Sequence, residues 1–146
     1  MATQRTAPTH TTYDVVIIGG AMLGSSVASF LSQNADFDGS VLVVEMDPTY
    51  EHSSTAHTNS CMRQQFSTEI NIRVSQFAAD YVKNFRRYMG DDPRIPDVPF
   101  QSYGYMYLAN TTGFADTLRD NQKLQAALGA GTKFMTPDDI ARDYPF

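Results

Sequence analysis

The sequence contains very little cysteine or histidine. Its 146 residues include one cysteine, Cys61, and three histidines, His10, His52 and His57. A single cysteine excludes an internal disulfide and a zinc site built from cysteines, and it fits a reducing compartment. The histidines do not lie at metal-ligand spacing. We therefore expect no metal centre and a cytoplasmic location.

The sequence also lacks basic runs and long apolar runs. It has 11 Lys and Arg against 16 Asp and Glu, a net charge of -5. Without a basic patch to displace counterions from phosphates, nucleic acid is an unexpected partner. The wholly apolar runs, such as residues 15–18, are far shorter than the about 20 residues of a membrane span. Residues 1–12 lack the apolar core of a secretory signal, and we expect them to form a disordered tail.

Two β-branched runs on either side of a glycine-rich turn are the clearest folding signal. Residues 13–18 predict a strand buried on both faces, and residues 41–44 predict a second one. Between them, apolar residues recur at helical spacing from Gly24 until the polar stretch 34–39. A strand, helix and strand in this order predict a βαβ unit with parallel strands, and hence an α/β fold of the Rossmann type.

The remaining elements follow from periodicity and turn residues. We expect a polar loop at 48–60, an amphipathic helix within 67–90, a proline-rich linker at 91–100, a tyrosine-rich strand at 101–108, a helix at 114–128 and a helix starting at Thr136-Pro137. The strand at 101–108 would open a second region with its own sheet.

The turn between the first strand and helix has the pattern G-x-A-x-x-G, from Gly19 to Gly24. A pyrophosphate needs converging backbone N–H donors and the positive end of a helix, and glycines permit the tight turn and close approach. Gly19 would make the turn, and Gly24 would let the helix pack on the strand. Ala21 replaces the middle glycine, which is a departure from the standard pattern.

An acidic residue, Glu45, follows the second strand. Its carboxylate could accept both hydroxyls of an adenosine ribose and would repel a 2′-phosphate, which disfavours NADP. It lies 26 positions after Gly19, against about 20 in the standard fingerprint. The alternative is a βαβ unit with a glycine turn and a solvated glutamate.

No third strand is expected soon after Glu45; the polar loop leads through Arg63 and Phe66 into the long helix. With these features the sequence resembles the FAD-dependent oxidoreductases of the D-amino-acid oxidase superfamily, which includes sarcosine oxidases and dimethylglycine dehydrogenases. The likeness covers nearly all of residues 13–146, and its specific parts are the turn and Glu45.

The resemblance implies FAD as the cofactor and a role for each matching position. The pyrophosphate would be held at the turn, the adenosine ribose by Glu45 and the phosphates also by hydroxyl and backbone donors of the polar loop. Arg63 would lie on the flavin and pair with a substrate carboxylate, because a guanidinium can form two parallel hydrogen bonds with a carboxylate. The alternative is an arginine that caps a loop or pairs with a surface acid. The cofactor-binding candidates are Gly19, Gly20, Ala21, Met22, Gly24, Glu45, Ser53, Ser54 and Thr55.

The resemblance further implies oxidation of a secondary or tertiary amine or amino acid, such as an N-methylglycine, by hydride transfer to the flavin. No catalytic acid or base is assigned to this chain. His57 and Cys61 are candidates for covalent flavin attachment, but a solvated histidine and a small buried cysteine are the favoured interpretations. The tyrosines at 101–108 could line a substrate cavity, although we favour sheet packing.

The resemblance implies three domain segments: an FAD-binding segment at 13–90, the linker at 91–100, and the start of a substrate domain at 101–146. Relatives of the superfamily are longer, so we expect an N-terminal fragment that is inactive alone. The electron acceptor stays open. Two alternatives from other classes are an NAD-dependent dehydrogenase, which requires a third parallel strand soon after residue 50, and a non-catalytic dinucleotide-binding fragment.

Overall fold

The computed structural model describes residues 7–145, which fall into two compact units that meet in sequence at Cys61 and Met62. The expected disordered tail lies partly outside this range, at residues 1–6. Of the tail, residues 7–12 are described and contain no helix or strand. The expected domain boundaries at 90 and 100 stay predictions.

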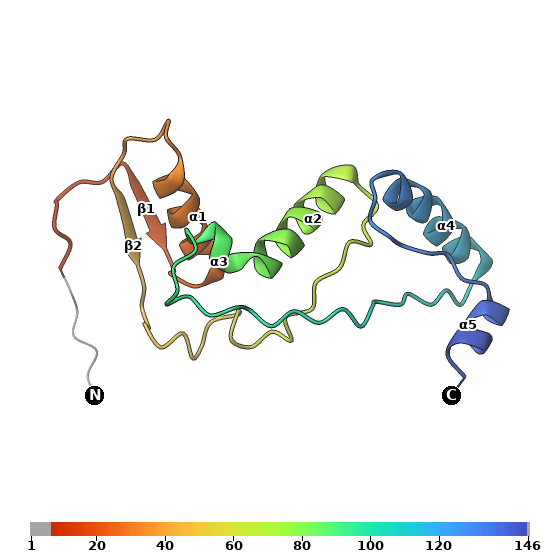
Figure 1. The fold of residues 1–146 in the computed structure, drawn as a ribbon. Coiled ribbons are helices and arrows are strands. Elements are labelled where there is room, and N and C mark those ends of the chain that lie inside the picture. The colour runs from red at the N-terminus through yellow and green to blue at the C-terminus, as the bar shows by residue number, and fades with distance from the viewer. Residues whose placement is uncertain (1–6, 146) are drawn as a thin grey trace. The chain divides into compact units, whose positions relative to one another are not determined.

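The first unit contains the βαβ arrangement. Strand β1 (Val15–Ile18) is followed by helix α1 (Met22–Gln33) and strand β2 (Val41–Val44), and α1 packs on the two strands (Figure 1). The strands pair in parallel, with Val15 beside Val41 and Ile18 beside Val44. The predicted βαβ unit and parallel pairing are confirmed.

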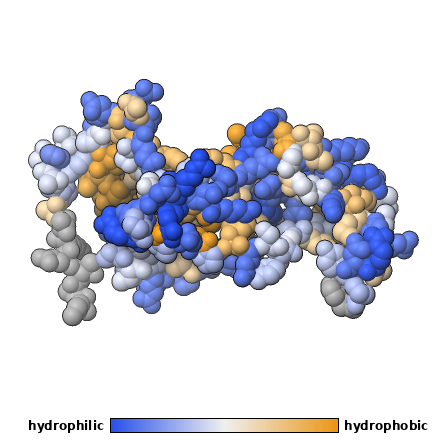
Figure 2. All heavy atoms as spheres, in the orientation of Figure 1, coloured by the Kyte–Doolittle hydropathy of each residue, from blue (hydrophilic) through white to orange (hydrophobic). Residues whose placement is uncertain are grey.

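The expectation that both faces of these strands are buried is wrong. Exposure alternates along β1: Val16 is exposed, and Ile18 is 89% exposed. Val44, which pairs with Ile18 on β2, is exposed too. The β-branched runs are apolar on both faces, but α1 covers only one of them, and within the described residues of the first unit no second layer lies over the other. Figure 2 shows the resulting apolar surface in the part of the view where Figure 1 draws the strands.

The second unit is helical. Its elements are α2 (Glu69–Lys83), α3 (Phe85–Tyr88), α4 (Thr112–Ala127) and α5 (Pro137–Asp143). The long helix predicted within 67–90 is confirmed as α2 and α3, which are separated at Asn84. Helix α2 contributes Ile72, the fully buried side chain of the described residues. Across residues 7–145, no helix combines the length and apolarity needed to cross a bilayer.

Side-chain hydrogen bonds define the ends of the later helices and hold α4 in place. The Thr111 hydroxyl accepts a hydrogen bond from the Phe114 amide at the start of α4. At α5, Thr136 and Asp139 form a reciprocal capping box on either side of Pro137, at the helix start that the sequence predicts. The Gln76 amide on α2 donates to the Leu128 carbonyl at the end of α4, at 2.8 Å.

The predicted strand at residues 101–108 does not form. A strand needs a neighbouring strand for its backbone hydrogen bonds, and within the described residues only β1 and β2 pair. Gly104 also has a φ of +88°, which interrupts an extended run. Instead, the Tyr105 carbonyl accepts a hydrogen bond from the Gln65 side chain at 2.7 Å. The tyrosines therefore do not pack on a sheet in this structure.

Candidate functional site

The turn between β1 and α1 depends on glycine at two positions. Gly19 has a φ of +95°, a conformation that residues with a Cβ rarely adopt. A Cβ on Gly24 would overlap the Gly19 carbonyl oxygen and lie 3.1 Å from Cγ2 of Ile17. The expected roles of Gly19 in the turn and of Gly24 in packing the helix on the strand are therefore confirmed.

The N-terminus of α1 is not capped by a side chain. Ala21 is the N-cap residue and makes no side-chain cap hydrogen bond, and the first turn carries no acidic residue. The first backbone N–H groups of a helix have no intrahelical acceptor, and the helix dipole makes this end positive. An anionic group such as a phosphate can satisfy both features at the mouth of α1.

Glu45, directly after β2, points to this turn. Its Oε2 accepts a hydrogen bond from the Gly20 amide at 2.6 Å, and its Oε1 accepts one from the Asp47 amide at 2.8 Å. The bond from Asp47, followed by that from Gly20, lowers the pKa of Glu45 below its ordinary value. The carboxylate is thus held ionised at the edge of the sheet where the turn lies.

These bonds divide the amides of the turn into two groups. The Gly19 amide donates to the Val44 carbonyl at 2.8 Å, and the Gly20 amide is bound by Glu45. A phosphate would therefore meet the amides from Ala21 and Met22 onward rather than those of the two glycines. Each Glu45 oxygen accepts one amide, and a carboxylate has about four lone-pair positions, so acceptors remain for ribose hydroxyls.

A cavity of about 360 Å³ lies beside the turn. The loop after β2 supplies one side of it, including two of its three expected residues, Ser53 and Thr55, whereas Ser54 is exposed and lies outside the lining. The full lining consists of Gly20, Ala21, Met22, Ser25, Tyr50, Ser53, Thr55 and Ala56. The turn, the helix N-terminus and the polar loop thus meet around one space.

Tyr50 is a residue of this site that the sequence reasoning missed. A Cβ on Gly20 would lie 3.1 Å from the Tyr50 hydroxyl oxygen, so Tyr50 stands directly over the turn. The loop reaches this position through hydrogen bonds from the Thr49 amide and hydroxyl to Asp47 and from the Tyr50 amide to the Asp47 carbonyl. An aromatic residue shortly after the acidic position was the signal available in the sequence.

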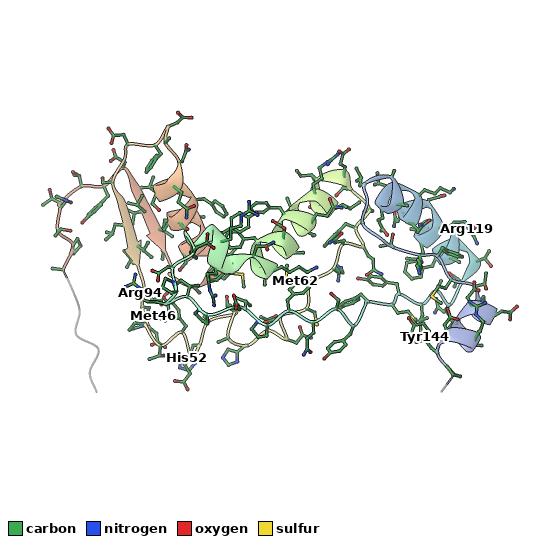
Figure 3. The ribbon with its side chains drawn as sticks, in the orientation of Figure 1. Met46, His52, Met62, Arg94, Arg119 and Tyr144 are labelled. Carbon is green, nitrogen blue, oxygen red and sulfur yellow. The ribbon has the colours of Figure 1, made fainter. Side chains whose placement is uncertain are left out.

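The remainder of the loop faces solvent. Figure 3 shows Met46 directly after β2 and His52 in the loop, and Met46 is 90% exposed. His57 is exposed, as expected. Cys61 is exposed too, so the expectation of a buried cysteine is wrong. The polar segment around Cys61 has no apolar layer that would cover a thiol.

Arg63 belongs to the second unit. Its guanidinium carbon lies 5.1 Å from the ring centroid of Phe66 and 5.6 Å from that of Tyr107. Within residues 7–145 no ion pair or hydrogen bond involves its side chain. The alternative of an arginine paired with a surface acid therefore does not describe this structure.

The sequence of residues 14–146 matches the protein-family model DAO, which is described as FAD-dependent oxidoreductase. The chain belongs to this family. It is 38% identical over 137 residues to FAD-dependent oxidoreductase domain-containing protein 1 of Xenopus laevis and 39% identical over 137 residues to the protein of that name from Bos taurus. Each alignment covers 91% of this chain but only 27% and 28% of the relative, so the chain spans about a quarter of the length of these curated relatives. No solved structure matches the chain.

Family membership decides the cofactor question. A DAO-family FAD-dependent oxidoreductase implies FAD, so the NAD-dependent dehydrogenase alternative is wrong. The fold agrees, since the first element after β2 is helix α2 and not a third parallel strand. The residues of the turn fit the ADP part of FAD: an uncapped helix N-terminus for phosphate and an ionised Glu45 for the ribose.

Proposed function

We propose that this chain is the ADP-holding part of an oxidoreductase that acts on a secondary or tertiary amine or amino acid, such as an N-methylglycine. The observation that carries the proposal is the hydrogen bond from the Gly20 amide to Glu45, which fixes a carboxylate beside the open N-terminus of α1. When bound, FAD supplies the acceptor for a hydride from the carbon next to the amine nitrogen.

The roles within the first unit follow from what each group can donate or accept. The α1 amides from Ala21 and Met22 onward would bind the pyrophosphate. Glu45 would accept hydrogen bonds from the ribose hydroxyls and exclude a 2′-phosphate by charge repulsion. Gly19 and Gly24 would act through the shape of the turn, and Ser53 and Thr55 would donate hydroxyls from the loop side of the cavity.

Arg63 would bind the substrate carboxylate. A guanidinium offers five N–H donors in a planar fork that matches a carboxylate, and this one has no acidic partner among the described residues. Its N–H donors would hold an amino-acid substrate by the carboxylate and leave the amine end of the substrate free. The amine specificity rests on this arginine and on the resemblance to sarcosine oxidases.

The test of the proposal is a flavin titration of the 146-residue chain. FAD fluorescence anisotropy should rise on addition of the chain, ADP should compete, and FMN, which lacks the ADP part, should not bind. Equal binding of FMN and FAD, or no binding of FAD, would contradict the proposal. For the substrate, a full-length relative can be mixed with N-methylglycine under anaerobic conditions, where loss of the flavin absorbance supports amine oxidation and an unchanged spectrum contradicts it.

A further inference from the structure

The surroundings of Arg63 differ from those of two other cationic side chains that lie over aromatic rings, Arg119 and Lys83. Arg119 also lies over an aromatic ring, 4.6 Å from the centroid of Phe134, but its guanidinium is paired with Asp116. Lys83 lies over one ring only, that of Phe100. Arg63 lies over two rings and has no acid partner within residues 7–145.

This combination has a chemical consequence. Aromatic rings attract a guanidinium through their negative faces, at centroid distances within about 6 Å, and they do not use its N–H donors. A carboxylate neighbour, in contrast, would occupy those donors. The Arg63 side chain is thus located by the two rings while its hydrogen-bonding fork stays available to an anionic ligand.

The backbone segments that carry the two rings are held by hydrogen bonds. The Phe66 carbonyl accepts a hydrogen bond from the side chain of Gln125, a residue of α4 that is only 6% exposed, at 2.9 Å. The Gln65 side chain donates to the Tyr105 carbonyl at 2.7 Å and so ties the segment of Arg63 to the segment of Tyr107. The Tyr107 ring also lies against that of Tyr105, with centroids 6.0 Å apart.

We propose that Tyr107 is a positioning residue for substrate carboxylate binding: with Phe66 it holds the Arg63 guanidinium by its face and so presets its N–H fork for a small carboxylate. This inference rests on the proposed role of Arg63. Preorganisation of this kind raises affinity because the side chain loses less rotamer freedom when the ligand binds. Tyr107 acts through its ring, and its hydroxyl is not required.

The experiment follows the Nε–Hε NMR signal of Arg63 in the 146-residue chain during titration with acetate and with N-methylglycine. In the native chain, ring currents should place the signal away from that of exposed Arg87, and both carboxylates should shift it saturably. Tyr107→Leu should move the free signal towards the Arg87 position and weaken carboxylate binding about two- to fivefold, whereas Tyr107→Phe should keep both properties. Tyr103→Leu is the matched control, because Tyr103 is 87% exposed and lies in the same segment.

Each outcome has a defined meaning. If Tyr107→Leu binds carboxylate as the native chain does, with unchanged amide signals of α2 and α4, the positioning role is overturned while the role of Arg63 stands. If neither carboxylate shifts the Arg63 signal of the native chain, the role of Arg63 and the inference built on it are both overturned. FAD anisotropy, which reports on the first unit, tests the cofactor part of the proposed function separately.

Discussion

The Gly20 amide and the Glu45 carboxylate, 25 positions apart in sequence, are joined by a hydrogen bond of 2.6 Å. Parallel pairing of β1 with β2 places the ends of both strands at the same edge of the sheet, so the turn after one strand meets the residue after the other. The bond therefore links the two halves of the proposed ADP site before any ligand binds.

Substitution Glu45→Gln should weaken FAD binding by about tenfold or more. The neutral amide can accept a hydrogen bond from Gly20 or Asp47 through one atom only, and it lacks the charge that strengthens bonds to ribose hydroxyls. FAD anisotropy measures the effect. Glu51→Gln, a change at an exposed glutamate of the same loop, is the control and should bind FAD normally. Equal affinities for the two variants would remove Glu45 from the site.

The stability of the turn should depend on pH through the ionisation of Glu45. Because hydrogen bonds from Asp47 and Gly20 lower its folded-state pKa, its contribution to stability is complete above the ordinary value of 4.5 and is lost as the pH falls through the lowered pKa. The NMR signals of the Gly20 and Asp47 amides should titrate together, with a midpoint below 4.5. A midpoint at or above that value, or an unchanged titration in Glu45→Gln, would argue against the bonds.

Substitution Gly24→Ala should destabilise the first unit by about 1–3 kcal/mol, because the new Cβ would overlap the Gly19 carbonyl oxygen. Gly113→Ala, in the first turn of α4, is the matched control, since a Cβ there meets nothing within 4 Å. Hydrogen exchange of the β1 and β2 amides measures the effect of Gly24→Ala, and exchange of the α4 amides measures the effect of Gly113→Ala. If both alanines are tolerated equally, the close packing of α1 on the turn is not what requires glycine.

The effect of a substitution in the loop on FAD binding should depend on whether the residue lines the cavity. Thr55→Val and Ser53→Ala each remove a hydroxyl from the cavity lining and should weaken FAD binding about three- to tenfold. Ser54→Ala should have no effect, because Ser54 lies outside the lining. FAD anisotropy of the three variants tests this order, and a loss confined to Ser54→Ala would show that the loop holds FAD in another way.

Local patterns in the sequence were sufficient for the βαβ unit and the helices. Val41–Val44 forms the predicted strand with the predicted bounds, and Thr136-Pro137 starts a helix with a capping box. These features depend on residues close in sequence, or on one short crossover. The position of Glu45 at the tip of the second strand was also predictable, whereas its role as the acceptor for ribose hydroxyls stays a prediction.

Features that depend on distant partners were not predictable. The tyrosine alternation at 101–108 fits a strand, but no partner strand exists within the described residues, and the segment is held by Gln65 instead. The engagement of the Gly20 amide by Glu45, the place of Tyr50 over the turn and the two rings around Arg63 are all results of three-dimensional packing. Periodicity and spacing contain no information on such contacts.

The most direct test of the proposed ADP site is an NMR titration of the isotope-labelled chain with ADP. We predict saturable shifts of the Ala21 and Met22 amides and of the Gly20 amide beside Glu45. Adenosine 2′,5′-bisphosphate should bind more weakly than AMP, from which it differs only by the 2′-phosphate. Shifts confined to other parts of the chain, or an unchanged spectrum at saturating ADP, would contradict the proposed ADP site.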